Sequence, residues 1–229
     1  MSIQNVSLDL PAVPDAAHGW GRRALDLGIA GSAAIVLSPV FGLIALALYL
    51  EGGQPIFTQT RVGAGGRPFQ MYKFRKFRPD CDTSGPPLTV EGDSRMTPIG
   101  RILAITKLDE LPQIWNVLCG DMAIVGPRPE SLAFADCFRG GHEEVLRYKP
   151  GLLGPSQVVF RHEAQLYPSA EEPTRFYRQT LFPAKARLDL DYFPHRTIAS
   201  DLAWMARGAM AIFGRASAQP KPMDRGHHP

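Results

Sequence analysis

The sequence contains little cysteine and little excess charge, and both shortages exclude classes of protein. Only three cysteines occur in 229 residues and no two form a C-x-x-C pair, so neither a disulfide framework nor a zinc site is expected. The formal net charge of +3 is too small to indicate a nucleic-acid partner. The chain also contains no Walker loop and no G-x-G-x-x-G fingerprint. Reducing surroundings fit this composition.

Long hydrophobic runs are also absent, with one exception. Residues 24–50 read ALDLGIAGSAAIVLSPVFGLIALALYL, in which Asp26 is the only charged residue. A straight helix of this length would measure roughly 40 Å, against about 30 Å for the hydrocarbon core of a bilayer. Ser38 and Pro39 lie in its middle, and a proline inside a helix removes a backbone donor and kinks the chain.

Both flanks of this run are basic, and basic flanks favour the cytoplasmic side of a membrane. A helix–break–helix that enters and leaves on one face satisfies both the break and the charges. We therefore predict a re-entrant membrane helix over residues 20–50, after an N-terminal tail over residues 1–19. A kinked spanning helix remains as the alternative.

A β-hairpin is predicted directly after the hydrophobic run. Two β-rich segments within residues 54–78 flank the turn sequence 63–66, which reads GAGG. The period of two would place Lys73 and Arg75 on one face of the second strand. Two such side chains form either a solvated strand edge or a clamp for phosphate.

Two adjacent acids follow a turn-rich loop. Leucines 108, 111 and 118 share a helical face with Ile114 and Trp115, so a helix is predicted with Thr106 as N-cap and with Asp109 and Glu110 at its N-terminus. Acids there usually only complement the helix dipole. Nearby cations would keep at least one of them ionised; the candidates are Lys73, Arg75, Arg101, Lys107 and Arg128. An ionised aspartate can attack phosphorus or hold a divalent cation.

The C-terminal third is predicted to be helical over residues 171–192 and 198–213. The last helix carries an apolar stripe that would face either the membrane interface or the core. Residues 214–229 are expected to be disordered. The predicted class is therefore α+β, in which the re-entrant helix is joined to a small, mostly helical cytosolic catalytic domain over residues 51–213 with a short β-hairpin and interfacial helices.

Several motifs in a fixed order resemble those of the bacterial sugar transferase family. They are the Ser38-Pro39 break, YKFR at 72–75, DELPQ at 109–113, NVL-x-GDM at 116–122, GPRP at 126–129 and KPG at 149–151. The resemblance covers roughly residues 20–213. This family comprises the monotopic polyprenyl-phosphate hexose-1-phosphate transferases, also called phosphoglycosyl transferases, which begin the assembly of bacterial glycans.

The resemblance implies a reaction and a place in the cell. Asp109 would attack the β-phosphate of a UDP-sugar, releasing UMP, and undecaprenyl phosphate would then take the phosphosugar from the covalent intermediate. Glu110 would assist, and Mg²⁺ is the implied cation, with Asp109 and Glu110 as its ligands. The resemblance implies donor contacts for Lys73 and Arg75 of the KFR motif and for Arg128 of the PRP loop. The full set of predicted substrate-binding residues is Lys73, Arg75, Arg101, Lys107, Pro127, Arg128 and Pro129. The catalytic domain would lie on the cytoplasmic face of the bacterial inner membrane; the sugar, the glycan pathway and a homodimeric state stay open.

Departures from the family pattern leave two rival functions. Ala104 stands where the family usually has an arginine, and we expect Lys107 or Lys76 to take over a phosphate contact. Ala104 also favours a non-catalytic membrane scaffold of the same fold. The D-x-D at residues 189–191 would fit a metal-dependent glycosyltransferase that releases UDP, although it lies in a helix-like run. Trp115 is expected in the core rather than as a platform for stacking a base.

Overall fold

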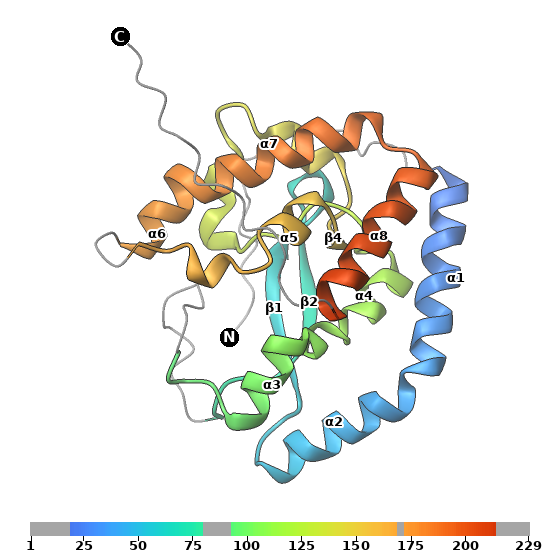
Figure 1. Ribbon diagram of the computed structural model, residues 1–229, viewed down its shortest axis with the longest axis vertical. Helices are drawn as coiled ribbons and strands as arrows, with labels where there is room; N and C mark the ends of the chain where they lie inside the picture. Colours follow the sequence, from blue (N-terminus) through green and yellow to red (C-terminus); the bar gives the residue numbers. More distant parts are fainter. Residues whose placement is uncertain (1–18, 80–92, 169–171, 214–229) are drawn as a thin grey trace.

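A computed structural model describes residues 19–79, 93–168 and 172–213. In Figure 1 a bent pair of helices lies along one edge of the domain, a β-hairpin lies near the middle of the view, and the C-terminal helices lie above the hairpin and next to the first helix. The helices are α1 (Trp20–Val36), α2 (Ser38–Leu50), α3 (Pro98–Thr106), α4 (Gln113–Cys119), α5 (Pro155–Val159), α6 (Pro173–Phe176), α7 (Phe182–Tyr192) and α8 (Ile198–Phe213). The strands are β1 (Ile56–Val62), β2 (Pro68–Phe74), β3 (Ala123–Val125) and β4 (Gly151–Leu153). The mixed class with small sheets is confirmed.

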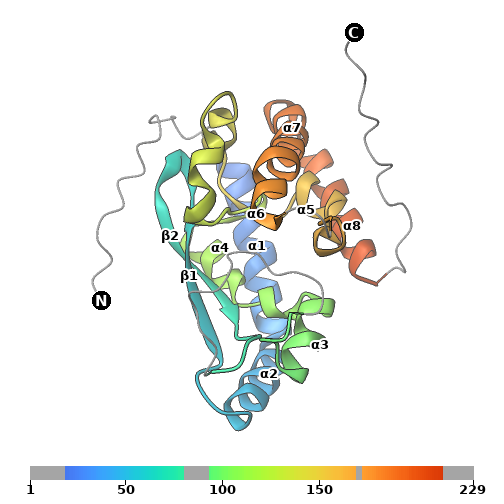
Figure 2. The ribbon, with the colours of Figure 1, turned by 90° about the vertical axis from the view of Figure 1, so that its left-hand side faces the viewer.

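The predicted hairpin is present. Strands β1 and β2 pair antiparallel, from Ile56 opposite Phe74 to Val62 opposite Pro68, and the turn contains Gly65 with φ of 64°. Figure 2 shows the hairpin on one side of the domain and α7 and α8 on the other. Strand β2 ends at Phe74, so Arg75 lies outside it. A second sheet pairs β3 and β4 in parallel.

The break in the hydrophobic run lies where the sequence predicts it. Helices α1 and α2 meet at a 60° bend, and Pro39 occupies the first turn of α2. Proline is tolerated there because N–H groups of the first turn have no partner within the helix. The Ser38 hydroxyl donates to the Ile35 carbonyl at 2.8 Å. In the described part of the chain, no single helix is both long enough and apolar enough to cross a membrane. Helices α1 and α2 meet these two criteria only when they are taken together as a bent pair.

Buried apolar side chains join the bent pair to the rest of the domain. Ala30 of α1 packs in one core with Val117 of α4 and Ile124 of β3. Leu48 of α2 packs in another with Phe74 and Leu103. A third core lies beneath α7 and the region of residues 132–147. The end of the hairpin and the segment that bears the two acids therefore rest against α1 and α2.

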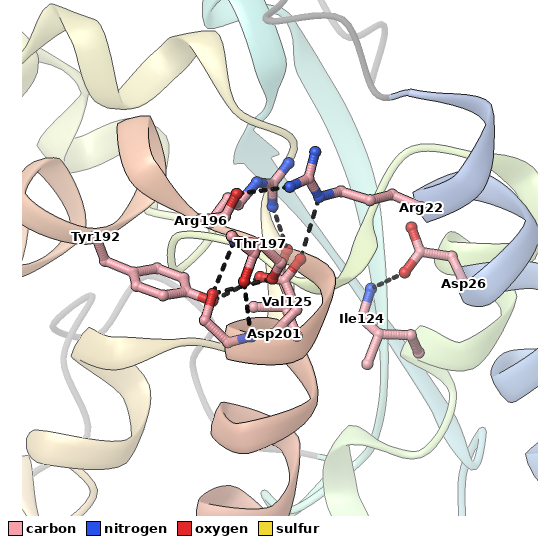
Figure 3. A network of polar contacts seen from close by, with 9 residues as sticks. Arg22, Asp26, Ile124, Val125, Tyr192, Arg196, Thr197 and Asp201 are labelled. Atoms are coloured by element: carbon pink, nitrogen blue, oxygen red, sulfur yellow. Dashed lines mark hydrogen bonds and ion pairs between the residues drawn. The ribbon is translucent and has the colours of Figure 1, made fainter.

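Polar contacts tie the start of α1 to α8, and we call the cluster of Arg22, Tyr192, Arg196 and Asp201 the α1–α8 tether (Figure 3). Arg22 Nε donates to Asp201 Oδ2 at 3.2 Å and Tyr192 donates to Asp201 Oδ1 at 2.6 Å. Arg22 also donates to the Arg196 carbonyl at 2.8 Å. Nearby, the buried Asp26 carboxylate accepts the N–H of Ile124 at 3.0 Å. Each buried charge of the tether has a partner.

The C-terminal helices largely follow the prediction. A π-helical turn, Tyr177–Leu181, links α6 to α7, and α8 spans the predicted residues. The apolar stripe of α8 is divided, because Met205 packs against the core while Ile198 and Leu202 are nearly half exposed. Most of the predicted N-terminal tail and all of residues 214–229 lie outside the described residues.

Candidate active site

The two adjacent acids lie in a short 3-10 turn, Leu108–Glu110, which we call the acid turn. Lys107, the residue before it, has φ of 61° and ψ of 14°, and this left-handed conformation ends α3. The prediction that Thr106 caps the acid-bearing helix is wrong, because its hydroxyl donates back to the Ile102 and Leu103 carbonyls within α3. The acid turn therefore precedes α4 instead of forming its first turn.

Strand β2 and helix α4 hold the acid turn against Lys73. Lys73 Nζ donates to Glu110 Oε1 at 3.0 Å, and both side chains are largely buried. Asn116 fixes the spacing of the two elements: its side chain donates to the Gln70 carbonyl at 2.7 Å and accepts the Tyr72 N–H at 3.1 Å. The fully buried Asn116 therefore acts as a cross-link between β2 and α4.

Asp109 and Glu110 have unequal surroundings. Asp109 is 3% exposed, and its Oδ1 is buried without a hydrogen-bond partner among the described residues. Burial raises the pKa of Asp109, against the opposing pull of Lys73. Burial would also raise the pKa of Glu110, but Lys73, Lys107 and Arg128 together lower it far below its usual range. Glu110 is therefore the more firmly ionised acid, while Asp109 has an oxygen to spare for a ligand.

The charges around the acid turn do not balance. Four cations (Lys73, Lys76, Lys107 and Arg128) act on the two acids, which is an excess of two positive charges when all are ionised. Burial and the neighbouring Lys73 lower the pKa of Lys76 to about 8, although Asp109 opposes them. Such an excess is suited to an anion of two or more charges, such as a diphosphate.

The predicted substrate contacts divide into two groups. Lys73, Lys107 and Arg128 lie near Glu110, as Lys76 does, and Pro127 and Pro129 flank Arg128 in its loop. Arg101, in contrast, is exposed on α3, and none of its described contacts joins it to the acids.

The predicted pairing of Lys73 and Arg75 on one face is wrong. Arg75 follows the last residue of β2 and turns toward the end of α2, where it donates to the carbonyls of Leu48 at 2.8 Å and Gly52 at 2.6 Å. It also forms an ion pair with Glu51 at 3.5 Å. The last carbonyls of a helix have no partner within the helix, and Arg75 supplies one. Its place in the structure is that of a cap on α2.

A small hollow beside the acid turn contains residues that sequence reasoning missed. Its lining includes Arg61, Lys73, Glu110, Gln113, Arg128 and Gln157. Arg61 donates to the Pro129 carbonyl at 3.3 Å and thereby joins β1 to the loop that carries Arg128. Nothing in the local pattern around Arg61 or Gln157 indicates a site, because both reach the hollow from distant segments.

An apolar cavity of about 530 Å³ lies next to the segment that follows the acid turn. Ser38 and Phe41 line it from the bent pair of α1 and α2, and Leu111, Pro112 and Trp115 line it from the segment after Glu110. Trp115 is 60% exposed, so the expectation that it lies in the core is wrong. The described residues therefore place a cationic hollow at Glu110 and an apolar cavity at the residues that directly follow it.

The D-x-D at residues 189–191 does not form a surface metal site. Asp189 lies on α7, is 4% exposed, and accepts the Ser156 hydroxyl at 2.9 Å. Burial raises the pKa of Asp189 to about 7, although Ser156 opposes this. Asp191 is two positions further along the helix and is exposed, so the two carboxylates point in different directions.

The described residues thus bring two adjacent acids and four cations together, and comparison with known families identifies the class of protein. The model of the bacterial sugar transferase family matches residues 17–215. The chain therefore belongs to the bacterial sugar transferase family.

Curated relatives carry consistent names. The chain is 42% identical over 152 residues to the UDP-glucose:undecaprenyl-phosphate glucose-1-phosphate transferase of Caulobacter vibrioides, covering 64% of this chain and 56% of that protein. It is 36% identical over 159 residues to the UDP-N-acetylgalactosamine-undecaprenyl-phosphate N-acetylgalactosaminephosphotransferase of Aeromonas hydrophila, covering 66% and 37%. A UDP-glucose:undecaprenyl-phosphate glucose-1-phosphate transferase of Escherichia coli is 39% identical over 141 residues, covering 60% and 30%. The chain thus spans about half or less of these relatives.

Proposed function

We propose that this protein transfers a sugar-1-phosphate from a UDP-sugar to undecaprenyl phosphate and releases UMP. This reaction would be the first membrane step in the assembly of a bacterial glycan. The names of the relatives support the substrates and the reaction. The observation that carries the proposal is the buried Asp109 with an unpartnered oxygen, next to an ionised Glu110 and among four cations. This arrangement combines a nucleophile with a site for two phosphates.

The first half-reaction uses Asp109 as the nucleophile. A carboxylate oxygen of Asp109 forms a bond to the β-phosphorus of the donor, and the bond from that phosphorus to the bridging oxygen of the UMP group breaks. UMP leaves with the bonding electron pair, and the sugar-phosphate stays on Asp109 as an acyl phosphate. Lys73 and Arg128 face the hollow beside Glu110, where they can stabilise the charge on the departing phosphate.

The second half-reaction regenerates Asp109. A phosphate oxygen of undecaprenyl phosphate attacks the same phosphorus, the bond to Asp109 breaks, and undecaprenyl-diphospho-sugar leaves. Lys73 holds Glu110 in place through the ion pair of 3.0 Å, so Glu110 stays a fixed negative group beside the nucleophile. Glu110 would help to hold the surrounding cations, and would be a ligand of a metal ion when one is bound.

The acids fit a magnesium ion. Asp109 Oδ1 is an orphaned buried oxygen, and Glu110 is ionised beside it. The described residues contain no cluster of three or more metal-ligating side chains, so within them the acid turn offers two carboxylates. Mg²⁺ commonly binds through one or two carboxylates and completes its shell with water and substrate phosphates. When bound, it would neutralise charge on the donor diphosphate.

The apolar cavity supports a lipid substrate and a membrane location. Its lining comes from the bend of α1 and α2 and from the residues that directly follow Glu110, so an isoprenoid chain in the cavity would bring its phosphate to the acid turn. We propose that α1 and α2 enter the bacterial inner membrane as a re-entrant pair from the cytoplasmic face. Two single-cysteine variants, Trp20→Cys and Glu51→Cys, test this with a membrane-impermeant thiol reagent. Both positions should react only from the cytoplasmic side.

The assignment is tested by the nucleotide that leaves. Purified full-length protein with Mg²⁺, undecaprenyl phosphate and a panel of UDP-sugars should release UMP with at least one donor, and EDTA should stop the release. Without lipid acceptor, a donor labelled in its sugar should label the protein, and Asp109→Asn should not be labelled. Release of UDP would instead favour a glycosyltransferase, and no nucleotide release with any donor would favour the non-catalytic scaffold.

A further inference from the structure

A second cluster of buried charged side chains lies behind the loop that carries Arg128. Tyr177 donates to Glu130 Oε2 at 2.5 Å, and Lys185 donates to Glu163 Oε2 at 2.5 Å. Lys185 also donates to the Tyr177 hydroxyl at 3.5 Å, which connects the two pairs. Tyr167 completes the chain by donating to Glu163 Oε1 at 2.7 Å. We call these five residues the rear network.

The rear network is assembled from segments far apart in the sequence. Glu130 follows the proline-rich loop, Glu163 begins a 3-10 turn after α5, Tyr177 lies in the π-helical turn and Lys185 lies on α7. Glu130, Tyr177 and Lys185 are each at most 6% exposed. Burying charges is costly, so a cluster of this kind persists only where the surrounding fold determines its geometry.

The charges of the rear network do not cancel internally. It holds two carboxylates, Glu130 and Glu163, against one ammonium group, Lys185, which leaves one excess negative charge when all three are ionised. Burial would raise the pKa of Glu163, but Lys185 and Arg128 lower it, so Glu163 is anionic. Arg128, which lies two residues before Glu130, is a cation that the rear network shares with the acid turn.

Arg128 lies between the rear network and the acid turn. Glu163, Glu110 and Glu130 outweigh the effect of burial and raise its pKa above the usual range. Even so, no ion pair or hydrogen bond joins the Arg128 side chain to another residue in the described segments of the chain. Arg128 therefore lines the hollow together with Glu110, under the electrostatic influence of acids from both the rear network and the acid turn. Its N–H donors are not bonded to any described residue and are available for an anion.

We propose that the rear network positions Arg128 for the donor diphosphate, with Glu163 as the principal positioning residue. This inference rests on the proposed function only for the identity of the anion. Without the negative charge of Glu163, Arg128 would shift toward Glu110 and pair with it, so both groups would be less available to the diphosphate. Glu163 itself touches Lys185 and Tyr167, not the hollow.

A purely electrostatic role and a positioning role of Glu163 predict opposite changes in UDP affinity for Glu163→Gln. If Glu163 acted only through its charge, its neutralisation would leave a more positive site and tighten anion binding. Positioning instead predicts weaker binding, by about fivefold, within the range of coupling found for neighbouring residues. The measurement is the dissociation constant of UDP for the full-length protein by calorimetry, together with the KM for the active UDP-sugar. Tighter or unchanged UDP binding would overturn the proposal.

A double-mutant cycle separates positioning from loss of stability. Arg128→Ala should weaken UDP binding, and adding Glu163→Gln to that variant should cause no further loss, because there is no guanidinium left to position. Equal effects of Glu163→Gln in both backgrounds would contradict the proposal. Tyr177→Phe is the second variant, since it breaks the contact to Glu130 without changing charge, and it should also weaken UDP binding only when Arg128 is present.

A matched control and a direct binding readout keep this test independent of catalysis. Glu144→Gln removes an exposed acid whose partner is Arg147 and should leave UDP affinity unchanged. If no UDP-sugar is turned over, the proposed function fails, yet the cycle on UDP binding still decides the role of the rear network. If turnover occurs but the cycle is additive, only the positioning role fails.

Discussion

The α1–α8 tether and the acid turn are both built from buried charged groups, but they satisfy those groups differently. In the tether, Asp201 accepts hydrogen bonds from Arg22 and Tyr192 through different oxygens. In the acid turn, Asp109 keeps an oxygen without a partner among the described residues, and Arg128 keeps its donors. Buried polar groups are normally paired, and leaving one unpaired costs free energy.

The difference separates charged groups that stabilise the fold from charged groups that are available to a ligand. A paired cluster stabilises the fold and gains little from a ligand, whereas an unpaired one is completed only by a ligand. Removing a charge should therefore have opposite consequences in the two regions: lower stability at the tether, and lower activity without lower stability at the acid turn.

The largest effect is expected for Asp109→Asn. Loss of the nucleophile should reduce UMP release at least about a thousandfold. The midpoint of thermal unfolding should stay the same or rise, because a neutral amide is less costly to bury than a carboxylate without a partner. Activity assays and thermal unfolding of the same preparation test both parts. A clear fall in unfolding temperature would mean that Asp109 belongs with the structural charges.

Asp189→Asn should change the pH dependence of stability and leave catalysis intact. The folded-state pKa of Asp189 is about 7 against an ordinary 3.8, so its stabilising contribution is full below about pH 4 and is lost as pH rises toward 7. The loss is at most roughly 4 kcal/mol. Between pH 5 and pH 8 the free energy of unfolding should fall more for the native chain than for the variant, as measured by unfolding at each pH. Loss of UMP release would instead revive the D-x-D as a functional site.

Asp201→Ala should destabilise the protein by about 3 kcal/mol, because it leaves the partly buried Arg22 without its acid. The release of UMP per folded molecule should change little. Thermal unfolding and activity at low temperature test this. The matched control is Glu144→Ala in the exposed pair with Arg147, for which no measurable change is expected. Activity loss comparable to that of Asp109→Asn would erase the distinction between the regions.

Lys107→Ala should raise the KM for the donor by about tenfold, the size of one charge-assisted contact to phosphate. Lys107 also has a left-handed backbone, which alanine tolerates poorly. Lys107→Gly removes the same charge and relieves the strain, so both variants should lose the same donor affinity and differ only in stability. Unchanged UMP release at low donor concentration would show that Lys107 makes no phosphate contact.

Trp115→Ala is expected to have the smallest effect and to act on the other substrate. The side chain lines the apolar cavity and is mostly exposed, so its loss should raise the KM for undecaprenyl phosphate about fivefold with little change in stability. Labelling of the protein by the donor alone should stay as before. Impaired labelling would place Trp115 at the donor instead.

Local patterns in the sequence determined the hairpin, the break at Ser38-Pro39, the C-terminal helices and the adjacency of the two acids. These features depend on residues near one another in the chain, such as the glycines of a turn or a proline within an apolar run. The same reasoning failed for Arg75 and Trp115. Their orientation is decided by α2 and by the cavity beside it, which lie elsewhere in the sequence.

The tertiary structure alone decided which charges are paired. Asp109 and Asp201 are both buried aspartates, yet the sequence does not distinguish them. The partners of Asp201 come from α1 and α7, whereas Asp109 Oδ1 has no hydrogen-bond partner in the part of the chain that the structure describes. The rear network was equally hidden, since Glu130, Glu163 and Lys185 meet only after the chain has folded. Charge pairing depends on distances of a few ångströms across the fold, and spacing along the chain does not encode those distances.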